Sequence, residues 1–497
     1  MKYDYSVIGA GVSGMSAAII LAQRGYRTAL IESADTTGPT IRGFTRRGVF
    51  FDTGFHYTGA LGRGELLDRL FRYIGISGKI VRVPFDSDGF DLFRCLNPSF
   101  EFSVPYGLEN LRARLIDAFP REGNAIAEYL QFILNAYQGL PFFNLDREMT
   151  SSLLPFRLHE ESLAEVLDRL TANALLRSVL SMHCLLHGVL PEEVPITNHA
   201  CVVGPYYESA HGISGGGRRL AEAFDERLQE TGVDVYCGSR TQKILVSDAG
   251  QVTGIRLEDG STIECWGCIA TAHPASLLEM VPDRALRPAY RETLGRLEDT
   301  SSAVILFGLC REPLEIIRHS NLFAFPTTQT TLGAREGIIE GSPLYITGTR
   351  TTGTQNSGAG AFTAICPAPN LKDAFWSQYP THDSASGYDR FKEEITRRLR
   401  AYIEEVIPEF RHNILFAECA TPYTLMKWTN NPTGSLYGVK HKIGHLNPMP
   451  LTKIENLYLA GQAVTGPGIL GAMVSAFLAC GYVLGHERLR KELREWT

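Results

Sequence analysis

The sequence predicts an α/β fold in which helices pack against a mainly parallel sheet. Three observations support this class. The first forty residues alternate strand, helix and strand, a second junction of the same kind lies within 40 residues of the C-terminus, and 497 residues suffice for a large core. Hydrophobic residues make up 44% of the chain and charged residues 21%, which excludes wholesale disorder and a polytopic membrane protein.

The predicted first element is a strand at residues 3–11, YDYSVIGAG. A helix-forming stretch at residues 15–25 closes at a glycine and leads into a second strand at residues 26–33. Strand, helix and strand in this order form a βαβ unit, whose strands are parallel and whose crossover is right-handed.

A glycine motif joins the first strand to the helix, with Gly9, Gly11 and Gly14 at GxGxxG spacing. The first glycine permits a tight turn, the second lets the backbone approach a pyrophosphate, and the third lets the helix pack against the strand. Glu32 closes the second strand, where a carboxylate accepts hydrogen bonds from ribose hydroxyls. A Rossmann-like dinucleotide site is therefore predicted. Its acid disfavours a 2′-phosphate, which leaves FAD or NAD.

The second strand-glycine-helix junction occupies residues 457–485. A cofactor held at both chain ends suits the longer flavin dinucleotide, because the second helix N-terminus can face the ring edge where negative charge develops on reduction. Non-covalent FAD is therefore favoured. Residues 466–485 are also apolar over nearly the length of a bilayer span, but a helix buried behind a cofactor is expected to be apolar all round, and we favour that interpretation.

The rest of the chain alternates between two predicted domains. Residues 66–200 have a mostly helical pattern, and strands return after Tyr206, with meander turns at residues 248–250 and 258–260. The predicted FAD-binding domain is discontinuous and the predicted substrate domain is α+β. The FAD-binding domain comprises residues 1–65, 205–285 and 430–497, and the substrate domain residues 66–204 and 286–429.

Charge and cysteine usage restrict the partners and the compartment. Lys and Arg number 48 against 54 Asp and Glu, without a basic run, so nucleic acid is not an expected partner. Ten cysteines without paired spacing indicate reduced thiols and a cytoplasmic location, and the N-terminus runs into a strand rather than a signal peptide. Residues 129–143 have the period of either a peripheral membrane patch or a buried helix, and the buried helix is slightly favoured.

Two spacings are typical of metal ligands, and we predict a metal at neither. Cys265 and Cys268 lack a second pair of ligands and lie in an expected strand, where they face opposite sides. His441 and His445 are four residues apart, but Gly444 between them disfavours the helix that this spacing needs.

Several motifs together resemble the retinol saturase branch of the phytoene desaturase and carotenoid isomerase family of flavoproteins. They are VIGAGVSGMSAA, FFDTGFHYTGAL, ESLAEVLDRL, TPYTLMKWTNNPTGSLYG and NLYLAGQAVTGPGILGAMVSA, which span nearly the whole chain in the family's order. The resemblance implies a flavin amine oxidase-like architecture, with a substrate domain that covers the flavin with an apolar tunnel. It also implies redox chemistry or isomerisation at carbon-carbon double bonds of isoprenoid polyenes.

By position, the resemblance implies a set of FAD-binding residues. They are Gly9, Gly11, Gly14, Glu32, Ser33, Arg42, Gly43, Thr241, Gly461, Gln462, Gly468, Ile469 and Leu470. The chain departs from the family at Gly38-Pro39, where the family usually has two glycines. Proline has no N–H, so it removes a donor from a place where the family's backbone contacts the cofactor.

The candidates for catalysis follow glycine turns or precede them. His56 and Tyr57 are expected near the flavin ring, although His56 could instead bond a backbone carbonyl. Glu208 becomes a proton donor if burial raises its pKa, the alternative being an exposed loop glutamate. The glycine run at residues 215–217 lacks a following acid, so no second nucleotide site is expected and electrons come from or go to an external partner.

Three hypotheses for function follow. The favoured one is an FAD enzyme that saturates, desaturates or isomerises a double bond of an apolar polyene or related lipid, with hydride transfer through flavin N5. The alternative is a flavin-dependent amine or amino-acid oxidase, which shares the glycine motifs. A third is a non-catalytic flavoprotein that carries a lipid or scaffolds a partner.

Overall fold

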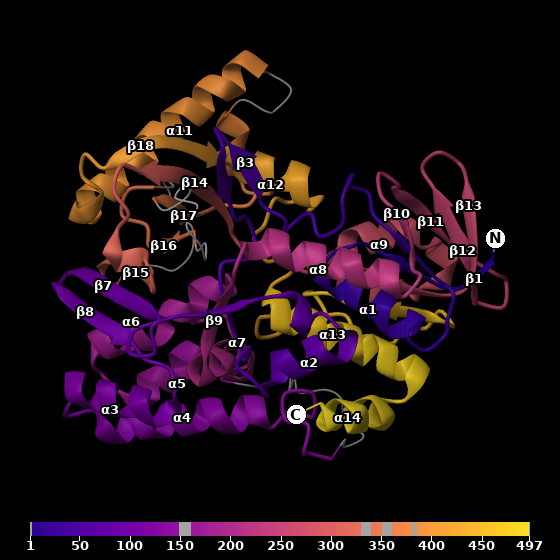
Figure 1. The fold of residues 1–497 in the computed structure, drawn as a ribbon, viewed down its shortest axis with the longest axis horizontal. Coiled ribbons are helices and arrows are strands. Elements are labelled where there is room, and N and C mark those ends of the chain that lie inside the picture. Colours follow the sequence, from indigo (N-terminus) through magenta and orange to yellow (C-terminus); the bar gives the residue numbers. More distant parts are fainter. Residues whose placement is uncertain (1, 149–160, 330–338, 350–359, 380–384, 497) are drawn as a thin grey trace.

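The computed structural model contains two large sheets with helices around them (Figure 1). It describes residues 2–148, 161–329, 339–349, 360–379 and 385–496. The N-terminus lies beside the first sheet, and the last helix lies at the lower edge of the molecule in Figure 1.

The first sheet has seven strands in the order β10-β2-β1-β13-β12-β11, with β19 also paired to β13. Its strands are β1 (Lys2–Ile8), β2 (Thr28–Ile31), β10 (Asp234–Tyr236), β11 (Thr241–Val246), β12 (Val252–Leu257), β13 (Thr262–Ala270) and β19 (Leu457–Leu459). The neighbours β10, β2, β1, β13 and β19 are parallel, while β11, β12 and β13 form an antiparallel meander. The predicted βαβ unit and meander are therefore confirmed, and the carboxyl ends of five parallel strands meet at one edge.

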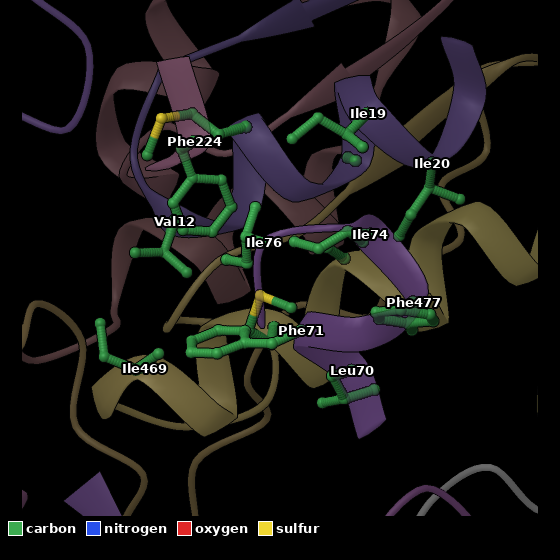
Figure 2. Close-up of a cluster of buried hydrophobic side chains, with 14 of the residues drawn as sticks. Val12, Ile19, Ile20, Leu70, Phe71, Ile74, Ile76, Phe224, Ile469 and Phe477 are labelled. Atoms are coloured by element: carbon green, nitrogen blue, oxygen red, sulfur yellow. The ribbon is translucent and has the colours of Figure 1, made fainter. Parts of the chain in front are cut away.

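Helices from distant parts of the chain share one core beside this sheet. They are α1 (Val12–Ala22), α2 (Leu66–Ile74), α8 (Gly216–Glu230), α13 (Gly468–Leu484) and α14 (His486–Glu495). Figure 2 shows Val12, Phe71, Phe224 and Phe477, from four of these helices, in one cluster. The shorter helices α9 (Pro274–Met280) and α10 (Pro288–Gly295) pack near the meander.

The apolar C-terminal stretch is the buried helix α13, as predicted. It packs along α1, and most of its side chains are buried. Within the described ranges, no helix is both long enough and apolar enough to cross a membrane.

The second sheet also has seven strands, in the order β18-β14-β17-β16-β15-β7-β8. They are β7 (Asp91–Asn97), β8 (Phe100–Val104), β14 (Ser302–Cys310), β15 (Asn321–Thr327), β16 (Leu344–Gly348), β17 (Ala361–Ala368) and β18 (Ile414–Ala420). Only the β7–β15 pair is parallel among these neighbours. The mostly helical pattern predicted for residues 66–200 missed β7 and β8, whose alternating burial has the period of a strand.

Helices cover both faces of the second sheet. Phe323 and Phe325 belong to the core formed with α3 (Leu108–Ala118), α4 (Gly123–Gln138), α5 (Leu163–Leu170), α6 (Ala174–Ser181) and α7 (Ile196–Glu208). Leu322 and Ala324 point the other way and pack toward α11 (Ala385–Val406). The apolar side of α4 is thus buried in a core, which accounts for the period of residues 129–143.

Small elements join the two halves. A hairpin is formed by β3 (Phe44–Arg46) and β4 (Val49–Phe51), and a three-stranded sheet by β5 (Thr58–Gly59), β9 (Ala210–Ile213) and β6 (Arg82–Pro84). Strand β9 connects α7 to α8, and α12 (Pro422–Thr429) lies near β14 and β18. The strands of each large sheet fall within the segments predicted for one domain, although α2, just past the predicted boundary at residue 65, packs with α1 and α14.

Candidate functional site

Four residues mark the carboxyl edge of the parallel strands. Gly9 follows β1, Glu32 follows β2, Thr271 follows β13, and Gly461 lies two residues after β19. Gly9 and Gly461 have φ angles of +95° and +108°, which glycine adopts without strain. Ligands of open α/β sheets bind at this kind of edge, where the strand order reverses direction.

The N-terminal glycine turn, residues 9–14, combines a tight contact with an open one. A Cβ on Gly14 would lie 1.8 Å from the carbonyl oxygen of Gly9, so only glycine allows this approach of helix to strand. A Cβ on Gly11 would meet no described atom within 4 Å. Gly11 is the N-cap of α1, where free N–H groups and the helix dipole favour an anion. This open cradle fits a pyrophosphate.

Glu32 connects the glycine turn to the end of β2. Its carboxylate is buried and accepts hydrogen bonds from the backbone N–H of Ala10 at 2.6 Å and of Ala34 at 2.8 Å. The Ser33 hydroxyl donates to the same carboxylate at 3.1 Å. The predicted acid thus lies against the cradle, where a ribose would follow a pyrophosphate.

The C-terminal glycine turn, residues 466–471, repeats the spacing of the first one. Gly466-Pro467-Gly468-Ile469-Leu470-Gly471 is itself a GxGxxG sequence, a spacing that was not among the sequence predictions. A Cβ on Gly471 would lie 2.4 Å from the Gly466 carbonyl oxygen, while Gly466 and Gly468 face open space among the described residues. Two strand-to-helix turns of one design therefore face the same edge.

Hydroxyl groups tie the two turns together. The Ser13 and Ser475 hydroxyls, on α1 and α13, are 2.8 Å apart, and Ser475 accepts a hydrogen bond from the Gly461 N–H. The Thr271 hydroxyl donates to the Ile8 carbonyl oxygen, and it would touch a Cβ placed on Gly9. The helix N-termini are thereby fixed relative to each other.

Residues 38–43, which follow β2, are held in place by an ion pair, hydrogen bonds and close packing against other parts of the protein. Arg42 forms an ion pair with Asp225 on α8 at 2.6 Å and donates to the Thr37 carbonyl oxygen at 3.0 Å. Gly43 has a φ of +67°, and a Cβ there would lie 2.5 Å from the Phe51 carbonyl oxygen. Before Pro39, the Gly38 N–H donates to the Ala10 carbonyl oxygen, which ties this segment to the N-terminal glycine turn.

The other predicted cofactor residues lie close in sequence to residues that contact this edge, since the Ser239 N–H, two residues before Thr241, donates to the Glu32 carbonyl oxygen and Gln462 follows Gly461. Thr241 opens β11, and its buried hydroxyl has no hydrogen-bond partner among the described groups. The Gln462 carbonyl oxygen accepts from Nε2 of His441 at 2.8 Å, so this histidine supports the backbone next to Gly461. Ile469, like Leu470, is nearly buried and lines a cavity.

The main cavity lies between the C-terminal glycine turn and the helices of the second half. Its walls come from α7, from the 3₁₀ helix Met182–Leu186 and the residues after it, and from residues 465–471. Most lining side chains are apolar or aromatic, and the described lining includes no Asp, Glu, Lys or Arg. Two polar atoms in the wall are buried without a partner in the described structure, namely Asn198 Oδ1 and Thr465 Oγ1.

Burial keeps the titratable cavity groups neutral. Desolvation lowers the pKa of His187 to about 3 and lowers the pKa of His441. It also raises the pKa of Tyr206 and of Tyr437, so both hydroxyls stay protonated. The cavity is therefore uncharged near neutral pH.

The three candidates for chemistry do not come together. His56 lines a second, smaller cavity with Asp52 and Thr347, and its ring centroid is 5.9 Å from that of Tyr345. Tyr57 and Glu208 are absent from the described lining of both cavities.

Tyr57 and Glu208 are engaged by other side chains. The Tyr57 hydroxyl donates to Asp91 at 2.8 Å, and desolvation raises the pKa of Tyr57 well above its usual value. Glu208 ends α7, where it is partly buried rather than exposed in a loop, and it accepts a hydrogen bond from Tyr137. Burial raises the pKa of Glu208, which the bond from Tyr137 partly opposes.

Asp91 is a buried acid that was not predicted from the sequence. Besides Tyr57, it binds Nε2 of His183 at 2.8 Å and accepts from Asn321 at 2.7 Å. Asn321 in turn accepts from the Thr347 hydroxyl at 2.7 Å. This network joins β7, β15 and β16 to the loop that carries Tyr57.

A second buried group, Cys184, His187 and His199, has the proximity of metal ligands. The Val189 N–H donates to Nδ1 of His187 at 3.3 Å, so neutral His187 carries its proton on Nε2 and donates to Nδ1 of His199 at 3.1 Å. His199 can then donate to Tyr129 at 3.3 Å, and desolvation lowers its pKa too. The structure thus holds these histidines in a continuous hydrogen-bond chain.

Comparisons with known proteins agree with this geometry. A family model described as flavin containing amine oxidoreductase matches residues 12–484. The all-trans-retinol 13,14-reductase of Macaca fascicularis is 26% identical over 526 residues, which cover 97% of this chain and 86% of that protein. The 4,4′-diaponeurosporene oxygenase of Staphylococcus aureus (strain USA300) is 22% identical over 498 residues, which cover 93% of this chain and 94% of that protein.

The fold has solved counterparts. An oxidoreductase from Methanosarcina mazei superposes with a TM-score of 0.66 at 16% identity, covering 96% of this chain and 99% of the other. At this identity the likeness concerns the fold alone, and it confirms the predicted α/β class.

Proposed function

The chain belongs to the flavin containing amine oxidoreductase family and is a flavin-dependent oxidoreductase, and from this premise we propose that it acts on carbon-carbon double bonds of an apolar isoprenoid polyene. The proposed reaction is saturation, desaturation or cis-trans isomerisation. FAD is the usual flavin of such enzymes. The open glycine cradles and buried acid fit it without a covalent link.

We assign the cofactor contacts by position. The N-terminal glycine turn and Glu32 would hold the pyrophosphate and ribose, and Thr241 would lie near the adenine. The C-terminal glycine turn would face the flavin ring, together with Gly461 and Gln462. A bound flavin supplies hydride exchange with a substrate carbon.

The uncharged cavity is the observation that carries the substrate proposal. It adjoins the C-terminal glycine turn, its walls are mostly apolar, and no acid or base with a formal charge lines its described part. Retinol and diaponeurosporene, named for the two relatives, are both isoprenoid polyenes. An amine cation would lack a carboxylate partner here, so the cavity disfavours the amine oxidase alternative.

Side chains of this protein have separate roles in the proposal. The apolar walls exclude water and orient a long chain, while Tyr206 and Tyr437 present aromatic faces or edges. In the described linings, His56 lines only the smaller cavity and not the one assigned to the polyene, so its role as a proton donor stays a prediction. Tyr57 is a positioning residue, since its hydroxyl is committed to Asp91. Electrons exchange with a partner outside the chain.

Absorbance spectroscopy tests the proposed function. The purified protein, oxidised or photoreduced, is incubated with retinoids and acyclic carotenoids, and the polyene absorption bands are followed. We expect one of the two states to shift or shorten the chromophore of at least one polyene. Unchanged polyenes, together with hydrogen peroxide release or flavin reduction by a panel of amines, would overturn the proposal in favour of amine oxidation.

A further inference from the structure

We propose that Asn198 recognises a hydroxyl group on the substrate. The inference rests on the proposed function, because it concerns the cavity assigned there to a polyene. It adds a specificity-determining residue at one wall of that cavity, on α7.

Asn198 is a buried polar group without a visible purpose in the fold. Its residue is only 9% exposed, and its Oδ1 atom has no hydrogen-bond partner among the residues that the structure describes. Buried side-chain amides usually form hydrogen bonds, because burial without a partner costs the free energy of removing the amide from water. The side chain lines the main cavity, so a molecule in that cavity can provide the partner.

The other polar groups of the wall are already engaged. Both ring nitrogens of His187 take part in hydrogen bonds, Tyr437 donates to the Leu185 carbonyl oxygen at 3.1 Å, and His441 binds the Gln462 carbonyl oxygen. Only Asn198 and Thr465 remain with an unsatisfied buried oxygen in the described lining.

These two oxygens belong to different walls. Thr465 directly precedes the C-terminal glycine turn, so we assign its hydroxyl to the cofactor side. Asn198 belongs to α7, which packs against α4 in the helical core of the second half. The amide is therefore assigned to the substrate side of the cavity.

A hydroxyl is the chemical group that matches this amide. An amide can present its oxygen or its nitrogen, and a hydroxyl can donate to the first or accept from the second. A cation would find no carboxylate in the described wall, and a pure hydrocarbon would leave the amide unpaired. Discrimination based on a hydrogen-bonding group is strong, because the analogue that lacks the group leaves a buried amide unsatisfied.

The test compares two probes that differ in one atom group. All-trans-retinol and the same polyene with a methyl group in place of CH2OH are titrated into the FAD-loaded protein, and binding is followed by quenching of tryptophan fluorescence. We expect the wild type to bind the alcohol about tenfold more tightly than the hydrocarbon, a ratio equivalent to about 1.4 kcal/mol. In Asn198→Leu, which keeps the side-chain shape, we expect this preference to disappear through weaker binding of the alcohol alone.

Two controls distinguish recognition from a structural role. Val202→Leu changes another lining residue of α7 that offers no side-chain hydrogen bond, and it should keep the preference between the probes. The flavin content and visible spectrum of Asn198→Leu should match the wild type. A flavin spectrum that changes while the preference persists would assign Asn198 to the cofactor and overturn the proposal.

The remaining outcomes separate the two proposals. Equal affinity of the wild type for both probes, or an equal loss for both in Asn198→Leu, would overturn the role of Asn198 while leaving the polyene substrate standing. If the wild type binds neither probe and acts on no polyene, the proposed function fails and the inference fails with it.

Discussion

The two glycine turns share a backbone design but differ in their surroundings. In each turn, a glycine lies against the carbonyl oxygen of the glycine five positions earlier. A Cβ added to Gly14 would lie 1.8 Å from that oxygen, and a Cβ added to Gly471 would lie 2.4 Å from it. The N-terminal glycine turn lies against the buried carboxylate of Glu32. The C-terminal glycine turn opens onto a cavity whose described lining carries no charged residue.

In the proposed assignment, the residues around each turn, more than its backbone, select the part of the cofactor that binds there. Both helix N-termini offer N–H groups and a positive dipole end. Glu32 adds a hydrogen-bond acceptor suited to sugar hydroxyls, whereas the uncharged cavity accepts an uncharged ring or chain. In the proposed assignment, the same backbone arrangement holds both ends of the cofactor.

The largest effect is expected from filling the close contact in each turn. Gly14→Ala places a methyl group against the Gly9 carbonyl oxygen, and Gly471→Ala does the same at Gly466. We expect losses of about 3 and about 2 kcal/mol in the free energy of unfolding, because overpacking at fixed backbone forces the helix away. Denaturant unfolding measures both. Gly123→Ala, where a Cβ meets no described atom, is the matched control.

The stability of these two variants relative to Gly123→Ala tests whether the close contacts matter. If Gly14→Ala and Gly471→Ala unfold like Gly123→Ala, the close approaches have no energetic importance and the comparison between the turns fails.

A second variant should affect the cofactor without affecting the fold. Gly11→Ala adds a methyl group to the open cradle at a φ of −71°, so the apoprotein should keep its stability within about 0.5 kcal/mol. The same methyl group would occupy the place of a pyrophosphate, and FAD affinity should fall about a hundredfold, equivalent to about 2.7 kcal/mol. Fluorescence titration of apoprotein with FAD measures it. Unchanged affinity would mean that the pyrophosphate lies elsewhere.

Glu32→Gln tests what distinguishes the two turns. The amide NH2 would face one of the backbone N–H groups that the carboxylate now satisfies, at Ala10 or Ala34. We expect about 1–2 kcal/mol lower stability and about tenfold weaker FAD binding. Glu258→Gln, at an exposed turn, serves as the control. A variant that binds FAD as the wild type does would remove the acid from the proposed ribose site.

Acidification should lower the stability of the protein through His187, which lines the main cavity. The folded-state pKa of His187 is lowered to about 3 by burial, while the unfolded chain titrates near 6.5. Below pH 6.5 the unfolded state binds the proton and the folded state does not, so stability falls as pH falls. The slope from His187 approaches about 1.4 kcal/mol per pH unit between pH 6.5 and pH 3.

Unfolding titrations between pH 5 and pH 8 check this dependence. His187→Leu should have a shallower slope than the wild type, whereas His319→Gln, at an exposed position, should keep the wild-type slope. Identical slopes for wild type and His187→Leu would contradict the neutral buried histidine.

The fold features predicted from sequence are those with local patterns. The βαβ unit, the meander and the buried character of α13 follow from periodicity and turn residues within short windows. The hairpin of β7 and β8 also has such a pattern, but it was outweighed by the helical segments around it. The acid at the N-terminal glycine turn was found because its spacing follows from one crossover.

The polar networks escaped prediction because their partners are far apart in sequence. Tyr57 meets Asp91 across 34 positions, and Asn321 meets it across 230. No pattern in the sequence around Asn198 predicts that it lines a cavity. The spacing of Cys184 and His187 was visible, but only the fold brings His199 to them.

The position of β13 between β1 and β19 also has a consequence for biosynthesis. β1 is complete after eight residues, whereas β19 begins at residue 457, so the ribosome adds about 450 residues between them. At roughly 5 to 20 residues per second, the N-terminal glycine turn is synthesised about 20 to 90 s before the C-terminal glycine turn. If both glycine turns hold the flavin as proposed, stable loading can occur only after nearly the whole chain has been synthesised.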